Sequence, residues 1–291
     1  MQPGRRALLA LVLALPLAAP AAAEERVLLE RKSEYNTIQV TEEDGLRVMR
    51  FVPGTVRQSV VKVGDPDHLE APYARAIPVA LVFARKPRNM LIVGLGGGTI
   101  PTFLHRRLPE LAIEVVELDP VVVEVAKSHF GLREDGKLRV HVGDGRRFIE
   151  QTARRYDLIL LDAFGSAEVP HALVTREFLR SVRRALAPQG VAIGNVWGPD
   201  DNRLYESMLR TYRAVFDAVY VVDIEDAVNR LVIALPWTPA LPREEVMRRA
   251  RALTVTLPLR EDLGPIVEHG FRLPGADGAT GRVLTDAEPP R

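Results

Sequence analysis

The sequence has no cysteine and few aromatic residues, and its charges almost cancel. Without cysteine the chain can form no disulfide, no thiolate nucleophile and no Cys-ligated zinc or iron–sulfur site. Its 39 lysines and arginines against 38 aspartates and glutamates give a net charge of +1, which excludes a nucleic-acid binder that depends on bulk positive charge. The six histidines are scattered, without metal-binding spacing. Any catalysis must therefore use carboxylates, histidines, hydroxyls or the backbone, and we expect neither a bound metal nor a nucleic-acid partner.

Long apolar runs are also lacking, except at the N-terminus. Arg5 and Arg6 precede an apolar run over residues 7–19, and Ala21-Ala22-Ala23 follows it. A basic start, an apolar stretch of about a dozen residues and small residues at a cleavage site are typical of a secretory signal. Such a run is too short to span a bilayer core of about 30 Å comfortably. We expect a signal peptide over residues 1–23 and export to the periplasm or another extracytoplasmic compartment. An uncleaved segment acting as a weak membrane tether is the alternative.

The rest of the chain shows two different patterns of apolar and polar residues. Apolar and polar residues alternate over residues 36–63, with turn residues at Asp44-Gly45 and Pro53-Gly54. This alternation predicts an antiparallel meander, which we assign to a small N-terminal β-domain over residues 24–70. Residues 236–291 are expected to form a C-terminal helical extension and a loose tail.

Strand-like and helix-like patterns alternate over residues 71–235, the predicted ligand-binding domain. The expected strands are Asn89–Val93, Ile113–Leu118, Leu138–Val142, Tyr156–Leu161, Gly190–Val196, Ala218–Val222 and Arg230–Leu235. The expected helices are Pro120–His129, Arg146–Ala153, Thr175–Leu186 and Asn202–Val215. This alternation predicts an α/β fold with a doubly wound, seven-stranded sheet. The last strand should run antiparallel, because residues 223–229 are too few for a crossover. Such a sheet is similar to the Rossmann-like fold of class I S-adenosylmethionine-dependent methyltransferases.

Three successive strand ends carry the signals of a nucleoside site. The first runs into a glycine-rich turn, where the backbone can approach a ligand closely. The second ends in an acid about 20 residues further on, where ribose hydroxyls are held. The third ends in an acid suited to an adenine amino group, although an N-cap role would explain it too. The predicted nucleoside-binding residues are Gly94, Gly96, Gly98, Glu117, Asp144 and Gly145.

The fourth strand ends in another carboxylate, Asp162, after the apolar run Leu158–Leu161. In an open α/β sheet the carboxyl ends of the strands face the ligand cleft. We therefore predict that Asp162 is the catalytic acid, with a turn or cap role as the alternative.

These segments, together with Thr175-Arg176-Glu177-Phe178-Leu179, resemble the spermidine/spermine synthase family over roughly residues 35–235. The resemblance implies a donor, decarboxylated S-adenosylmethionine, whose propyl carbon is attacked by an amine. It implies that Glu117 holds the ribose, that Asp144 reads the adenine, and that Asp162 orients and deprotonates the amine. The leaving thioether is neutral, so no metal is required and alignment would supply most of the acceleration.

The sequence departs from the family pattern at three acidic positions. Gly97 stands where the family usually carries an aspartate that grips the aminopropyl ammonium. Gly165 stands where a second aspartate normally contacts the amine. Arg75, in Tyr73-Ala74-Arg75, replaces an acid that faces the polyamine, and we expect it to bring a cation into the pocket. Ordinary S-adenosylmethionine would then no longer be repelled as a donor.

Four further residues are candidates for substrate binding. Gln58 could reach the ligand from the β-domain, Tyr73 could line the pocket, Glu168 could replace the lost second acid, and His171 could shuttle a proton. The alternatives are an exposed strand residue for Gln58, core packing for Tyr73 and a solvated loop for His171. The leading hypothesis is an aminopropyltransferase acting on a small amine. A methyltransferase and a non-catalytic nucleoside or polyamine binder are the alternatives, and a homodimer is left open.

Overall fold

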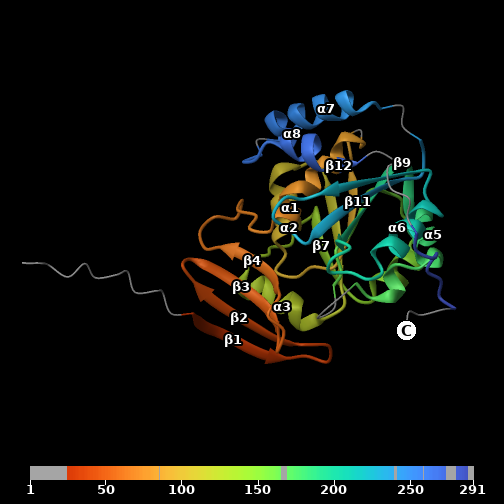
Figure 1. Cartoon of the computed structure of the whole chain (residues 1–291). Helices are drawn as coiled ribbons and strands as arrows, with labels where there is room; N and C mark the ends of the chain where they lie inside the picture. The colour runs from red at the N-terminus through yellow and green to blue at the C-terminus, as the bar shows by residue number, and fades with distance from the viewer. Residues whose placement is uncertain are drawn as a thin grey trace, which may run out of the picture.

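The computed structural model describes residues 25–84, 86–164, 169–238, 241–257, 259–272 and 280–287. Two sheets dominate it, a small antiparallel sheet at the N-terminal end and a large mixed sheet covered by helices on both faces (Figure 1). The predicted signal peptide lies outside the described residues. Within the described ranges, no helix has the length and apolar character needed to cross a membrane.

The N-terminal sheet has four antiparallel strands in sequential order. They are β1 (Arg26–Lys32), β2 (Thr37–Glu43), β3 (Leu46–Val52) and β4 (Arg57–Lys62). The expected meander omitted β1, a charged and largely exposed edge strand without a clear apolar alternation. One face of the sheet packs on helix α3 (Pro120–His129), where Ile38, Val40 and Met49 are buried in one cluster with Val122 and Val125. This packing joins the small sheet to the large one.

Over the residues that the structure describes, the large sheet has eight strands in the order β12-β10-β11-β9-β8-β5-β6-β7. Their bounds are β5 (Asn89–Val93), β6 (Ala112–Glu117), β7 (Leu138–Val142), β8 (Tyr156–Leu161), β9 (Leu186–Trp197), β10 (Ala218–Asp223), β11 (Asn229–Leu235) and β12 (Phe271–Arg272). The strands β5 to β9 pair in parallel, whereas β11 is antiparallel to both β9 and β10. The predicted doubly wound sheet with an antiparallel end is confirmed. Its eighth strand, β12, was not expected, because two residues carry no periodic signal.

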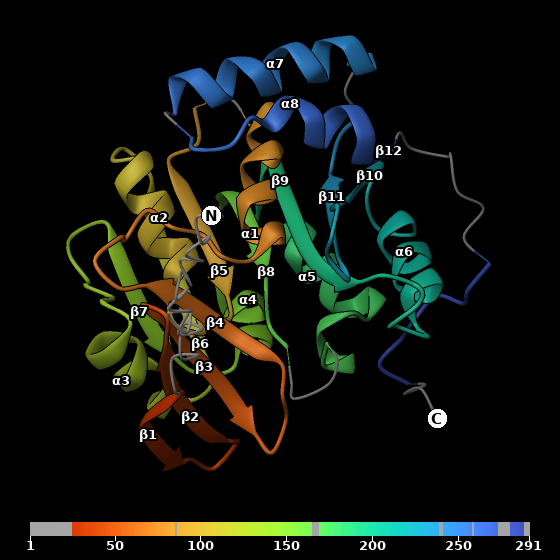
Figure 2. The ribbon, with the colours of Figure 1, turned by 60° about the vertical axis from the view of Figure 1, so that its left-hand side comes forward.

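Helices cover both faces of the large sheet. One face holds α4 (Gly145–Gln151), α5 (Arg176–Ala185) and α6 (Tyr205–Arg213). The other face holds α1 (Pro72–Ala76), the 3₁₀ helix η1 (Ile77–Val82), α2 (Thr99–Arg107), α3, α7 (Arg243–Thr256), α8 (Leu263–Pro265) and the π-helical turn η3 (Ile266–Gly270). A second 3₁₀ helix, η2 (His171–Leu173), precedes α5. In Figure 2, α7 and α8 lie across one end of the molecule, next to α1.

The order in which the chain adds strands to the sheet reverses between β5 and β8. The chain continues from β5 to β6 and β7 on one side, and from β8 to β9 on the other. Ligands in open α/β sheets bind at such a switch point, beyond the carboxyl ends of the strands. The glycine-rich turn and Asp162 follow the two strands that flank it.

The expectation of a loose C-terminal tail is wrong for residues 280–287. Leu284 is only 1% exposed and belongs to the core beneath α5 and α6. Both backbone polar groups of Leu284 are hydrogen-bonded. Its amide donates to Thr211 Oγ1 at 2.9 Å, and its carbonyl accepts from the Arg176 amide at 2.8 Å. The two apolar residues Val283 and Leu284 are too few to form a periodic pattern from which this anchoring could be predicted.

Candidate active site

The glycine-rich turn after β5 depends on backbone conformations that favour glycine. Gly94, Gly96 and Gly98 have φ angles of +98°, +53° and +74°. A β-carbon at Gly94 would lie 2.3 Å from the carbonyl oxygen of Asp162, so even alanine would collide with the backbone there. Gly98 is the N-cap of α2 and supplies no side-chain cap, so the first amides of this nine-residue helix can face an incoming ligand.

Glu117 is the last residue of β6, and its side chain hydrogen-bonds to this turn. Its Oε2 accepts a hydrogen bond from the Leu95 amide and its Oε1 accepts one from the Asp119 amide, both at 2.9 Å. Burial raises the pKa of Glu117, while these backbone bonds oppose the rise. Each oxygen keeps lone-pair capacity for a further donor such as a ribose hydroxyl.

Asp144 is exposed at the end of β7 and caps α4, accepting from the Arg147 amide at 2.9 Å. The capping alternative for Asp144 is therefore observed, and it leaves Oδ2 available to another donor. Gly145 packs against β5, where an added β-carbon would lie 2.4 Å from Cγ1 of Val93. The strands β5, β6 and β7 are neighbours, so the predicted nucleoside-binding residues lie along one edge of the sheet.

Asp162 lies at the centre of a hydrogen-bonded group. Its Oδ1 accepts from Asn195 Nδ2 at 2.8 Å, and its Oδ2 accepts from the Tyr73 hydroxyl at 3.3 Å. Burial raises the pKa of Asp162 to about 6, although both hydrogen bonds favour the charged form. Burial, reinforced by the Asp162 carboxylate, raises the pKa of Tyr73 well above its usual value, so Tyr73 stays a donor.

Asn195 and Asn229 were missed by the sequence reasoning. Asn195 is 3% exposed on β9, and its Oδ1 accepts from Asn229 Nδ2 on β11 at 2.9 Å. With its oxygen engaged, Asn195 can present only its amide hydrogens to Asp162. A signal was available, because Asn195 is the one polar side chain in the stretch Val191–Val196.

An aromatic pair lies next to this group. The rings of Phe164 and Trp197 stack with their centroids 5.7 Å apart. Phe164 follows Asp162 by two residues, and Trp197 follows Asn195 by two, so Trp197 lies on the same face of β9 as Asn195. Aromatic faces beside a carboxylate suit a cationic or aliphatic amine.

The structure brings some of the remaining candidates to the site and not others. Tyr73 contacts Asp162, and Gln58 lies on β4 beside Ser59, whose Oγ accepts from the Gly97 amide at 2.7 Å. His171 makes no hydrogen bond with Asp162, and its Nε2 is buried without a partner in the described part of the chain. Glu168 and Gly165 lie outside the described residues.

The expected cation in the pocket is not there. Arg75 forms an ion pair with Glu261 at 2.6 Å, on the segment between α7 and α8. Residues two apart in a helix point in directions about 200° apart, so Arg75 faces away from Tyr73 and Asp162. The expectation was wrong because Arg75 pairs with Glu261, a residue so distant in the sequence that local reasoning could not foresee the contact.

Gly97 has no room for a side chain. A β-carbon there would lie 2.6 Å from Cδ1 of Phe130 and 3.0 Å from Cβ of Ser59. The space that an aspartate would need at this position is occupied by an aromatic ring and a serine.

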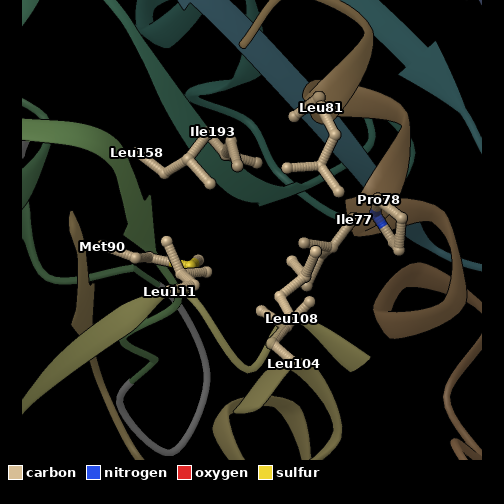
Figure 3. Close-up of a pocket in the computed structure, with 10 residues that line it drawn as sticks. Ile77, Pro78, Leu81, Met90, Leu104, Leu108, Leu111, Leu158 and Ile193 are labelled. Atoms are coloured by element: carbon tan, nitrogen blue, oxygen red, sulfur yellow. The ribbon is translucent and has the colours of Figure 1, made fainter. Parts of the chain in front are cut away.

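A small cavity under the sheet is not the ligand site. It has room for about 10 Å³, roughly one water molecule, and its lining is aliphatic (Figure 3). It is lined by Ile77, Pro78, Ala80, Leu81, Met90, Leu104, Leu108, Leu111, Leu158 and Ile193. No polar side chain there could hold a ribose or an amine. Nor do the described ranges contain a cluster of three metal-ligating side chains.

Known proteins are similar to this chain in sequence and in fold. The spermine/spermidine synthase domain family matches residues 71–228. A polyamine aminopropyltransferase of Vibrio vulnificus is 34% identical over 242 residues, covering 80% of each chain. The eEF1A lysine and N-terminal methyltransferase of Bos taurus is 34% identical over 225 residues, which are 71% of this chain but only 32% of the methyltransferase.

Two solved structures show the same fold with related ligands. A spermidine synthase in complex with the transition-state analogue AdoDATO superposes with a TM-score of 0.68 at 19% identity, covering 86% of each chain. Human methyltransferase-like protein 13 in complex with SAH superposes with a TM-score of 0.59 at 31% identity, covering 66% of this chain and 94% of that one. With its family domain over residues 71–228 and its aminopropyltransferase relatives, the chain belongs to the spermine/spermidine synthase family, a family of transferases that has a related methyltransferase branch.

Proposed function

We propose that this enzyme transfers an aminopropyl group from decarboxylated S-adenosylmethionine to a small amine. The observation that carries the proposal is Asp162, a buried carboxylate at the switch point with Tyr73 and Asn195 bonded to its two oxygens. An acceptor amine arrives as an ammonium and must lose a proton before its lone pair can attack carbon. Asp162 attracts the cation and accepts that proton.

The donor is proposed to occupy the edge formed by the ends of β5, β6 and β7. Glu117 would accept from the ribose hydroxyls, Asp144 from the adenine amino group, and the amides of the glycine turn would line the rest. The amine nitrogen forms a bond to the propyl carbon as that carbon's bond to sulfur breaks, and methylthioadenosine leaves as a neutral thioether. The chain's contribution is to align the three reacting atoms and to take up the proton.

The test is a product assay with purified protein. Decarboxylated S-adenosylmethionine is incubated with a panel of mono-, di- and triamines, and methylthioadenosine and alkylated amine are measured by mass spectrometry. Equal amounts of both products are expected. Binding of methylthioadenosine by calorimetry without product from any amine would favour the non-catalytic binder instead.

Methyl transfer from S-adenosylmethionine is the second candidate, and Gly97 favours it. Phe130 and Ser59 fill the place of the acid that would hold the aminopropyl ammonium. Without that carboxylate, the carboxylate of S-adenosylmethionine meets less repulsion at this end of the site. The same assay with S-adenosylmethionine decides between the candidates, because a methylated amine and S-adenosylhomocysteine would replace the two products above.

We also propose that residues 1–23 direct export, on the strength of their signal-like pattern. N-terminal sequencing of protein from a periplasmic fraction should begin at Glu24. Intact protein confined to the cytosol would contradict the proposal.

A further inference from the structure

The C-terminal extension makes a set of ion pairs with the segment that carries Tyr73. Arg260 bonds Asp65 through both Nη atoms, at 2.6 and 2.8 Å, and Glu261 bonds Arg75 at 2.6 Å. Asp65 and Arg75 flank the loop and helix that lead into and contain Tyr73. All four residues lie outside the group around Asp162.

The helix that carries Tyr73 is held by its neighbours, because it runs directly into the buried 3₁₀ helix η1 and has no side-chain cap at its other end. It is α1, only five residues long, and it has no side-chain N-cap. A single isolated helical turn is unstable in water, so its placement depends on tertiary contacts. Its own residues Ala74 and Ala76 are buried, and Arg75 is its ionic contact with the extension.

The contact that α1 makes with Asp162 is sensitive to small movements. At 3.3 Å, the distance from the Tyr73 hydroxyl to Oδ2 exceeds the usual 2.7–2.8 Å of such a bond. A shift of α1 by a few tenths of an ångström would therefore form it fully or break it.

The extension combines a fixed attachment with an adjustable one. Its apolar side packs on η1, directly after α1, where Val246, Ala250 and Leu263 share a core with Ile77 and Val79. Figure 2 shows α7 and α8 next to α1, and α7 packs against η1. The ion pairs, in contrast, are partly exposed to solvent and border a cavity lined by Asp67, His68, Leu69, Arg75, Phe103, Leu259, Arg260 and Glu261. Ion pairs next to solvent are individually weak and open readily.

We propose that Glu261 and Arg260 form a latch that positions Tyr73 against Asp162, so that the extension outside the matched family domain adjusts the reacting carboxylate. Glu261 and Arg260 are positioning residues and touch no reacting atom. The inference deepens the proposed function, but the contact between Tyr73 and Asp162 exists whichever group is transferred.

The test measures the titration of the Asp162 carboxyl group by NMR in protein labelled at aspartate, with Asp162→Asn identifying the signal. Tyr73 and Asn195 are the groups that hydrogen-bond Asp162, and both favour its charged form. Tyr73→Phe should therefore raise the midpoint, by about one pH unit. Glu261→Arg should raise it in the same direction. Added positive charge acting directly would lower the midpoint, so the sign separates positioning from simple electrostatics.

Two further variants sharpen the test. The double variant Arg75→Glu with Glu261→Arg restores an ion pair and should return the midpoint toward that of the unaltered protein. Glu268→Gln removes an acid of the same extension that pairs with Arg251 at 3.7 Å and not with α1, and it should leave the midpoint unchanged. Thermal unfolding of each variant confirms that it is folded.

The outcomes are distinguishable from those of the proposed function. A Glu261→Arg midpoint that stays in place or falls, while Tyr73→Phe raises it, would overturn the latch. Where transfer activity is found, the KM for the acceptor should rise several-fold in Glu261→Arg while donor affinity stays the same. Absence of any transfer would refute the proposed function and leave the titration to decide on the latch.

Discussion

The pKa of Asp162 reflects a balance between burial and two hydrogen bonds. Burial disfavours its charge, whereas the donors Asn195 and Tyr73 stabilise it, and the pKa rises to about 6. A base with this pKa is ionised at neutral pH and is still strong enough to accept a proton. The ordinary pKa of an aspartate would make it a weaker base.

The balance predicts an acidic limit to the reaction. Below pH 6 Asp162 is increasingly protonated, so kcat/KM should fall about tenfold per pH unit relative to its value above pH 7. Asp162→Asn should lower the rate by about 10²–10⁴-fold and remove this dependence of kcat/KM on pH. Rates of both proteins are measured from pH 5 to 9 with one amine, so that the ionisation of the amine cancels in the ratio. A ratio independent of pH would exclude Asp162 as the base.

Asn229 should influence Asp162 without touching it. Asn229→Ala would release the oxygen of Asn195, which could then turn and accept from a protonated Asp162. This hydrogen bond stabilises the protonated form of Asp162, so the acidic limb of the pH–rate profile should move to higher pH by about half a unit. Kinetics across the same pH range provide the measurement, and thermal unfolding serves as the control for folding. An unmoved limb at a normal melting temperature would contradict the role of Asn229.

At the scale of elements, the site depends on how closely two strand ends approach. The amide of Asp162 donates to the Val93 carbonyl at 2.9 Å, which brings the turn after β5 against the residue after β8. Gly94→Ala should therefore displace the turn and weaken donor binding at least tenfold, because its β-carbon would lie 2.3 Å from a backbone oxygen. Gly136→Ala is the matched control, since a β-carbon there meets nothing within 4 Å. Calorimetry with methylthioadenosine compares the two, and equal affinities would refute the role of Gly94.

Elements could be predicted where local chemistry marks both ends. The helix over Pro120–His129 is preceded by a capping aspartate, Asp119, and followed by Gly131, and its predicted bounds match the structure. The edge strands β1 and β12, the second of only two residues, lacked such signals. In the site, the strand-end acids were readable from sequence. The pairing of Asn195 with Asn229 and the filling of Gly97 by Phe130 were not, because they depend on packing between distant segments.

At the scale of the whole molecule, two parts of the C-terminal region are attached to opposite faces of the sheet. The extension from α7 to β12 covers the face that carries α1, and residues 280–287 cross the face that carries α5 and α6. The second attachment is both apolar and ionic, since Leu284 is buried and Asp286 pairs with Arg146 beside Gly145. The Arg146 guanidinium holds the pKa of Asp286 at about 2.

The apolar part of this attachment should dominate its stability. Leu284→Ala leaves a cavity in the core and should lower the free energy of unfolding by about 2–4 kcal/mol. Asp286→Asn should cost less than about 1 kcal/mol, because the pair is exposed to solvent and salt. Its effect should decrease as the pH falls below about 4 and vanish below about 2, where Asp286 is protonated in the folded protein too. Urea unfolding of each variant gives the energies, and Val255→Ala, at a side chain 80% exposed, is the control expected to change little. A Leu284→Ala protein as stable as the control would mean that the tail only rests on the surface, and that the fold beneath α5 and α6 is complete without it.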